Sequence, residues 1–256
     1  MIKPIEFKNG KNLTLRGFIH EPDNFETAVI FLHGFPASNN YPVSIRIGES
    51  LEKLNYLVLR FEFSGTNSSD GQLEDKLMSE EVNDIKYAID FIHSNYSVKQ
   101  LILVGHSTGA INAALYAHRD ARINKVILLG GVGNLKEAIS YDFSTEQVQD
   151  FLSKGAITFN IQNHWTFNKK LKKAFYDEFF TLDVLGSLSK FENQVLIIHG
   201  ENDEAVPVSK DPIELHQAAK NSKLFIIKNA DHKFLELEHW NELITEVDKF
   251  IRTELA

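Results

Sequence analysis

The chain has 256 residues and a mass of 29.1 kDa, with 43% hydrophobic and 24% charged residues, as in a globular domain with a sizeable core. Its net charge of −8 argues against nucleic acid as a main partner and gives no reason to expect an anionic membrane surface. The lack of cysteine excludes disulfides, a thiol nucleophile and thiolate metal sites. The N-terminus has no apolar core of signal-peptide length, and no apolar stretch could span a bilayer, so we expect a cytoplasmic protein.

Short apolar strands alternate with helical patterns along most of the chain. Ile5–Phe7 and Leu13–His20 flank an Asn-Gly turn and predict an opening antiparallel hairpin. Further strands are predicted at Ala28–Leu32, Tyr56–Phe61, Leu101–Val104, Lys125–Leu129, Gln194–Ile198 and Lys223–Ile227. Helices are predicted at Pro42–Leu54, from Ser79 onwards, at Ala110–Ala117, near Pro212–Lys220 and around Trp240–Ile251. This alternation predicts an α/β fold with a mostly parallel central sheet covered by helices on both faces.

One segment interrupts this alternation. Residues 134–191 are too long and too apolar for a loop, so we expect a cap inserted after the sixth strand, with residues 1–133 and 192–256 forming the core. Within this cap, Ser144 and Gln147 form a capping-box pattern that opens a short helix, which Gly155 ends. A small hairpin is predicted from Ile157 to Phe167, followed by a helix at Lys169–Phe180.

The run from Leu101 to Ala110 contains the sequence Gly-His-Ser-Thr-Gly between a buried strand and an Ala-rich helix. We predict a sharp turn with Ser107 at its apex, in a strained backbone conformation. Gly105 and Gly109 flank the serine where a Cβ would collide as strand and helix approach. Such an elbow lifts a serine hydroxyl clear of the sheet, so Ser107 is the candidate nucleophile.

A serine hydroxyl needs a base within reach, and the base needs a third group to orient it. His232 stands in a loop after the final strand, at the sheet edge where Ser107 emerges, whereas His33, His106 and His199 are expected to be structural. The loop after the preceding strand offers Asp203 as the best-placed acid. Its rivals are Glu201, Glu204 and Asp231, which can equally be solvated surface acids. The order serine, acid, histidine is that of one known triad architecture.

Four motifs stand in this order: His33-Gly34-Phe35, Gly105-His106-Ser107-Thr108-Gly109, His199-Gly200-Glu201-Asn202-Asp203 followed by Val206-Pro207, and Asp231-His232. Together they resemble the α/β-hydrolase superfamily over nearly the whole chain. The resemblance implies an α/β-hydrolase fold with Ser107 as nucleophile, His232 as base and Asp203 as acid. It also implies an oxyanion hole made by the backbone N–H groups of Phe35 and Thr108.

Within that superfamily, Leu59–Gly65 and Ser68–Gly71 are similar to a loop of bacterial cinnamoyl (feruloyl) esterases, as is the predicted cap. The chain differs from that family's pattern at Glu62, at Gly65-Thr66-Asn67 and at Thr108. The cap is expected to set acyl specificity. Five cap residues could line a pocket for an aromatic acyl group or could serve in ordinary packing: Tyr141, Gln147, His164, Trp165 and Tyr176.

We therefore predict a serine carboxylic-ester hydrolase that forms an acyl-enzyme and acts on small or medium acyl esters, hydroxycinnamoyl esters included. Alternatives on the same triad are a peptidase, a thioesterase and a monoacylglycerol lipase. A ligand receptor without turnover is the alternative from another class. No metal-binding, phosphate-cradling or dinucleotide motif appears, so no metal or cofactor is implied, and the partner is a small-molecule ester. The oligomeric state stays open, a homodimer included.

Overall fold

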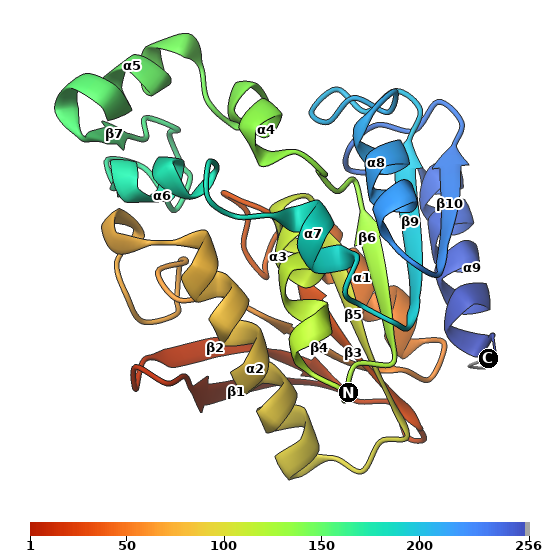
Figure 1. The fold of residues 1–256 in the computed structure, drawn as a ribbon. Coiled ribbons are helices and arrows are strands. Elements are labelled where there is room, and N and C mark those ends of the chain that lie inside the picture. Colours follow the sequence, from red (N-terminus) through yellow and green to blue (C-terminus); the bar gives the residue numbers. More distant parts are fainter. Residues whose placement is uncertain (254–256) are drawn as a thin grey trace.

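The computed structural model describes residues 1–253, which form an eight-stranded sheet covered by helices on both faces (Figure 1). The strand order is β1-β2-β4-β3-β5-β6-β9-β10. The bounds are Ile2–Lys8 (β1), Thr14–His20 (β2), Thr27–Leu32 (β3), Leu57–Phe61 (β4), Gln100–His106 (β5), Lys125–Leu129 (β6), Gln194–Gly200 (β9) and Ser222–Ile227 (β10). β2 is antiparallel to β1 and to β4, and every other pairing in this sheet is parallel. The predicted fold class is confirmed.

The central strands are buried on both faces, so alternate residues supply two separate cores. Ile30 and Leu32 of β3 join the larger core, and Val29 and Phe31 join the other. The first is covered by α2 (Met78–Asn95), α3 (Thr108–Tyr116), α7 (Val184–Leu188) and α8 (Asp211–Ala218). The second is covered by α1 (Pro42–Glu52) and α9 (Leu237–Arg252). Short 3₁₀ turns lie at Leu73–Asp75 and Ala117–Arg119.

A buried lysine ties the sheet to the last helix. Lys125 begins β6 and is 0% exposed. Its ammonium donates hydrogen bonds to the carbonyl oxygens of Phe250 (2.8 Å), Ile251 (3.0 Å) and Thr253 at the C-terminal end of α9. These carbonyls lack partners within the helix, and the negative end of the helix dipole favours a cation there. Lys125 therefore satisfies and anchors the end of α9.

The cap lies above the carboxyl edge of the parallel strands (Figure 1). It contains α4 (Leu135–Asp142), α5 (Thr145–Lys154), β7 (Ala156–Thr158), β8 (Lys170–Lys172) and α6 (Lys173–Glu178). The capping box of Ser144 and Gln147 and the end of α5 at Gly155, with φ of 75°, are both as predicted. The helix predicted at Lys169–Phe180 is wrong at its start, because Lys170–Lys172 pair with β7 and close the hairpin there. α7, at the end of the inserted segment, packs against α3 of the core.

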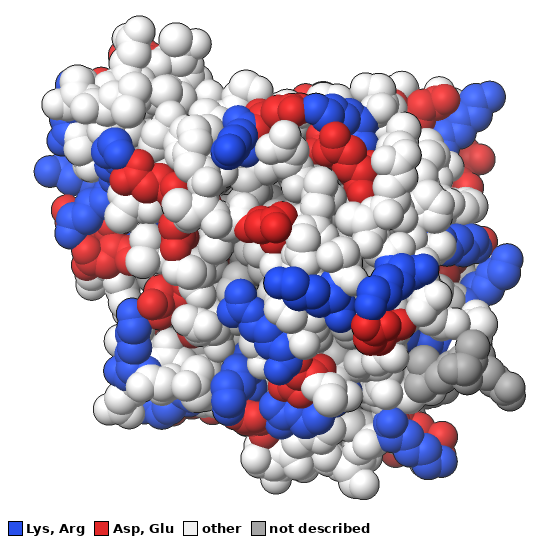
Figure 2. All heavy atoms as spheres, viewed as in Figure 1, with Lys and Arg blue, Asp and Glu red and all other residues white. Residues whose placement is uncertain are grey.

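Charged side chains of both signs lie on the face of the molecule that Figure 2 shows. On the face shown in Figure 2, basic and acidic side chains are interspersed without a large patch of one sign. Among the residues that the structure describes, no helix is long and apolar enough to cross a membrane.

Candidate active site

Ser107 stands at a sharp turn between β5 and α3. Its φ of 55° and ψ of −123° form a conformation that side chains rarely adopt. A Cβ on Gly105 would lie 2.2 Å from the carbonyl oxygen of Gly109, and one on Gly109 would lie 2.0 Å from that of Leu32. Both positions therefore require glycine, because β3, β5 and α3 approach too closely for a side chain. The turn predicted from the sequence is present.

His232 and Asp203 form a hydrogen-bonded pair. The Nδ1 atom of His232 lies 2.7 Å from Asp203 Oδ2, and because a carboxylate only accepts, we assign the proton to Nδ1. The other oxygen, Oδ1, accepts from the backbone N–H groups of Ala205 (2.9 Å) and Val206 (2.7 Å). Burial acts to raise the pKa of Asp203, but the His232 hydrogen bond and charge outweigh it, so the pKa is lowered. The acid is thus ionised and rigidly held.

The rival acids each bind a backbone N–H instead. Glu201 accepts from Asn229 (3.0 Å), Glu204 accepts from the amide of His232 (3.1 Å), and Asp231 accepts from Leu235 (2.8 Å). They order the loop that carries His232. Asp203 is the candidate acid whose carboxylate reaches the His232 imidazole.

Two further histidines surround this pair. The Nε2 atom of His199 donates to the carbonyl oxygen of Val206 (2.8 Å) and lies 3.2 Å from Asp203 Oδ2. The Nε2 atom of His106 donates to the carbonyl oxygen of His232 (2.9 Å), and the two rings lie 4.9 Å apart. Burial lowers the pKa of both, that of His106 to about 3, so they are neutral. Their positions at strand ends signalled structural residues, but not their contacts with the acid and the base.

The predicted oxyanion donors belong to two segments next to the serine. A Cβ on Gly34, which precedes Phe35, would lie 2.9 Å from Ser107 Cβ, so the loop after β3 passes directly over the serine. Thr108 is the first residue of α3, at the positive end of the helix. Neither the Phe35 nor the Thr108 N–H donates to another group within residues 1–253. Both are available to a developing oxyanion.

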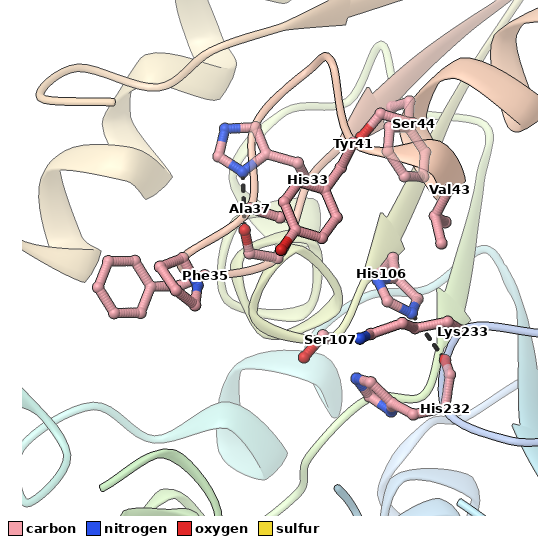
Figure 3. A pocket seen from close by; sticks show the side chains of 13 residues that line it. His33, Phe35, Ala37, Tyr41, Val43, Ser44, His106, Ser107, His232 and Lys233 are labelled. Carbon is pink, nitrogen blue, oxygen red and sulfur yellow. Dashed lines mark hydrogen bonds between the residues drawn. The ribbon is translucent and has the colours of Figure 1, made fainter. Parts of the chain in front are cut away.

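A cavity of about 150 Å³ brings these groups together (Figure 3). Ser107 and His232 lie beside each other in its wall, together with His106 and Lys233. Its apolar wall consists of Phe31, Phe35, Pro36, Ala37 and Val43, and its other polar side chains are His33, Tyr41 and Ser44. The volume lies below the roughly 300 Å³ at which pockets for drug-sized ligands begin, so it suits a small group.

The five cap residues predicted for substrate binding are not in the wall of this cavity as the described residues form it. Tyr141 donates to Asp211 (3.3 Å), Gln147 closes the capping box, His164 contacts the Thr166 hydroxyl (2.7 Å), and Tyr176 stacks on Phe151 (5.3 Å). The Trp165 indole N–H donates to the carbonyl oxygen of Pro36 (2.8 Å). Their part in substrate binding stays a prediction.

The cap reaches the site through the loop after β3, which carries Phe35 and Pro36. The Phe35 ring lies 5.9 Å from that of Phe159 and 5.1 Å from that of Phe175, both cap residues. With the Trp165–Pro36 hydrogen bond on the next residue, the cap holds the segment that carries the Phe35 N–H. No pattern in the sequence indicated this contact.

Glu62 organises the loop after β4. It is 0% exposed and accepts from the backbone N–H of Ser68 (2.9 Å) and the side-chain amide of Asn67 (2.9 Å). Beside this loop, the buried Lys76 and Glu81 form an ion pair (2.6 Å), and Glu81 also accepts from Asn112 of α3 (2.7 Å). This polar network fixes the loop to the elbow helix. In the described part of the chain, no cluster of three or more ligand side chains could hold a metal.

The comparisons place the chain in a family. The family model of the alpha/beta hydrolase fold matches residues 27–159, and the chain belongs to that family. The mitochondrial palmitoyl-protein thioesterase ABHD10 of Rattus norvegicus is 25% identical over 235 residues, covering 87% of this chain and 74% of that protein. Est1E of Butyrivibrio proteoclasticus, solved with ferulic acid, has a TM-score of 0.79 at 22% identity and covers 96% of this chain and 97% of its own. Mouse ABHD10 has a TM-score of 0.77 at 20% identity over 97% and 98% of the two chains.

Proposed function

We propose that the protein is a serine hydrolase that cleaves carboxylic esters of small or medium acyl groups through an acyl-enzyme. One observation carries this proposal: Ser107 at its elbow and His232 line a single cavity, and Asp203 binds the His232 imidazole from behind the cavity wall. A hydroxyl, an oriented imidazole and a buried carboxylate are the parts that nucleophilic acyl transfer needs.

In the proposed reaction, the Ser107 oxygen attacks the ester carbonyl while its proton passes to His232 Nε2. The Phe35 and Thr108 N–H groups stabilise the oxyanion, a contribution worth ~10²–10³ in kcat for each donor. The tetrahedral intermediate collapses, the alcohol leaves with the proton from His232, and Ser107 keeps the acyl group. Water then repeats the sequence, releasing the acid and restoring the serine hydroxyl. Asp203 keeps Nδ1 protonated throughout.

A thioester is the second candidate substrate, because the ABHD10 relatives are named palmitoyl-protein thioesterases. The same residues serve both reactions, since only the leaving group differs. The small apolar cavity favours a short acyl chain over a palmitoyl group. The likeness to Est1E, solved with ferulic acid, keeps hydroxycinnamoyl esters within the proposal.

The test measures hydrolysis of 4-nitrophenyl acetate, butyrate and octanoate, methyl ferulate, and butyryl and palmitoyl thioesters by the wild type and Ser107→Ala. We expect turnover of the short oxygen esters that disappears in Ser107→Ala. A fluorophosphonate probe should label the wild type and not the variant. Turnover of thioesters alone would replace the ester proposal with the thioesterase. A folded protein without Ser107-dependent turnover or labelling would overturn both.

A further inference from the structure

Lys233 directs a positive charge into the cavity that holds the nucleophile. Its side chain lies in the cavity wall with Ser107 and His106, and Figure 3 shows it extending towards the Ser107 side. Lys233 is exposed to solvent, and within residues 1–253 its ammonium forms no ion pair. The reaction proposed above gives this cation no task.

The backbone of Lys233 is held firmly on both sides. His232 and Phe234 are buried, and Phe234 donates its N–H to Asp231 (3.3 Å). The guanidinium of Arg46 in α1 binds the carbonyl oxygens of Phe234 and Leu235 (3.2 Å each). The direction in which the lysine leaves the chain is therefore fixed by packing.

The described cavity wall contains a lysine and no carboxylate, although the protein is acidic. None of its described wall residues is Asp or Glu, while the chain as a whole carries −8. Burial keeps His33 and His106 neutral by lowering their pKa values, and the ionised Asp203 lies outside the described wall, where it accepts the Nδ1–H of His232. Three other acids near the cavity lie outside its described wall. Glu204 and Asp231 accept backbone N–H groups of the loop that carries Lys233, and Asp142 of α4 is exposed to solvent.

We propose that Lys233 makes the enzyme selective for esters that carry a carboxylate a few bonds from the scissile carbonyl. The inference rests on the proposed function and names its substrate class. An ammonium at the cavity wall without a counter-ion in the described chain gains a charge-assisted hydrogen bond when such a carboxylate enters. A neutral ester of the same size fills the apolar wall but leaves the cation unpaired.

The experiment compares mono-4-nitrophenyl glutarate with 4-nitrophenyl pentanoate, which has the same number of acyl carbons without the carboxylate. The ratio of their kcat/KM values is measured for the wild type, Lys233→Met and Lys233→Arg. Lys228→Met is the matched control, since Lys228 is exposed, unpaired in the described chain and outside the cavity wall. Lys233→Met should lower the glutarate-to-pentanoate ratio about tenfold, the size of one charge-assisted hydrogen bond. Lys233→Arg should restore most of it, and Lys228→Met should match the wild type.

A glutarate-to-pentanoate ratio that Lys233→Met leaves unchanged overturns the inference. This holds also if both substrates slow equally, since the lysine would then act on the oxyanion and not on the substrate carboxylate. A second measurement avoids turnover: the Kd of the glutarate ester is compared between Ser107→Ala and Ser107→Ala/Lys233→Met. About tenfold weaker binding in the double variant supports the inference, and equal binding refutes it. Loss of all Ser107-dependent hydrolysis would instead refute the proposed function.

Discussion

Replacing Asp203 with Asn is expected to reverse the tautomer of His232. Oδ1 of Asp203 accepts from two backbone N–H groups, those of Ala205 and Val206. The amide oxygen of Asn must keep that position, because an NH₂ group there would face two donors. The NH₂ group therefore replaces Oδ2 and donates to Nδ1 of His232. The imidazole then carries its proton on Nε2 and cannot accept one from Ser107.

A triad whose histidine has the wrong tautomer loses ~10⁴ in kcat, or about 5.5 kcal/mol of transition-state stabilisation. We expect this loss in Asp203→Asn, with KM changing little because Asp203 lies outside the cavity wall. The assay is steady-state hydrolysis of 4-nitrophenyl butyrate at pH 7.5, with thermal unfolding measured in parallel. Glu201→Gln is the control, since a Gln oxygen can still accept from the Asn229 N–H. Activity of Asp203→Asn within tenfold of the wild type, or an equal loss in Glu201→Gln, would refute the reasoning.

Three other perturbations test the surrounding structure. Trp165→Phe removes the 2.8 Å hydrogen bond to the carbonyl oxygen of Pro36. A net hydrogen-bond contribution of about 1 kcal/mol corresponds to a loss of about fivefold in kcat. An unchanged kcat would count against the idea that the cap holds the loop that carries Phe35. Lys125→Met leaves the α9 carbonyl oxygens without their donor and should lower the free energy of unfolding, measured by urea titration, by about 1–3 kcal/mol. A more stable variant would show that burying the lysine charge costs more than its hydrogen bonds contribute. Burial lowers the pKa values of His20, His33, His106 and His199, so below pH 6.5 the unfolded chain takes up protons that the folded one does not. Stability should therefore fall as the pH falls from 7.5 to 5, by at most ~1.4 kcal/mol per pH unit for each histidine, and a flat urea midpoint would contradict this.

The sheet and the candidate triad could be predicted because their signals are local. A buried parallel strand is a continuous apolar run, and the elbow needs its glycines within two residues of Ser107. Strand order then places the loops after β9 and β10 at the same edge as the serine. The choice among Glu201, Asp203 and Glu204 needed the three-dimensional structure, because these acids lie within a few residues of one another and only their hydrogen-bond partners tell them apart.

The cap was harder to predict, because its structure depends on contacts distant in sequence. Lys170–Lys172 belong to an amphipathic helical pattern, but pairing with β7 makes them a strand. The buried Lys76 and Lys125 likewise gave no signal, since lysines are mostly exposed and only their partners reveal them. The residue type of Trp165 leaves substrate binding and ordinary packing both open, and only the structure shows that its indole contacts the backbone of Pro36.

The contact between the cap and Phe35–Pro36 has a consequence for how this enzyme could diversify. The cap enters and leaves the core between β6 and β9, so exchanging it for another lid looks like a modular change. Yet Phe35 packs between two cap aromatics, and the peptide that follows it is held by Trp165. A grafted lid that lacks those groups would alter the chemical step together with the substrate range. Selection on specificity and selection on rate therefore act on the same few residues.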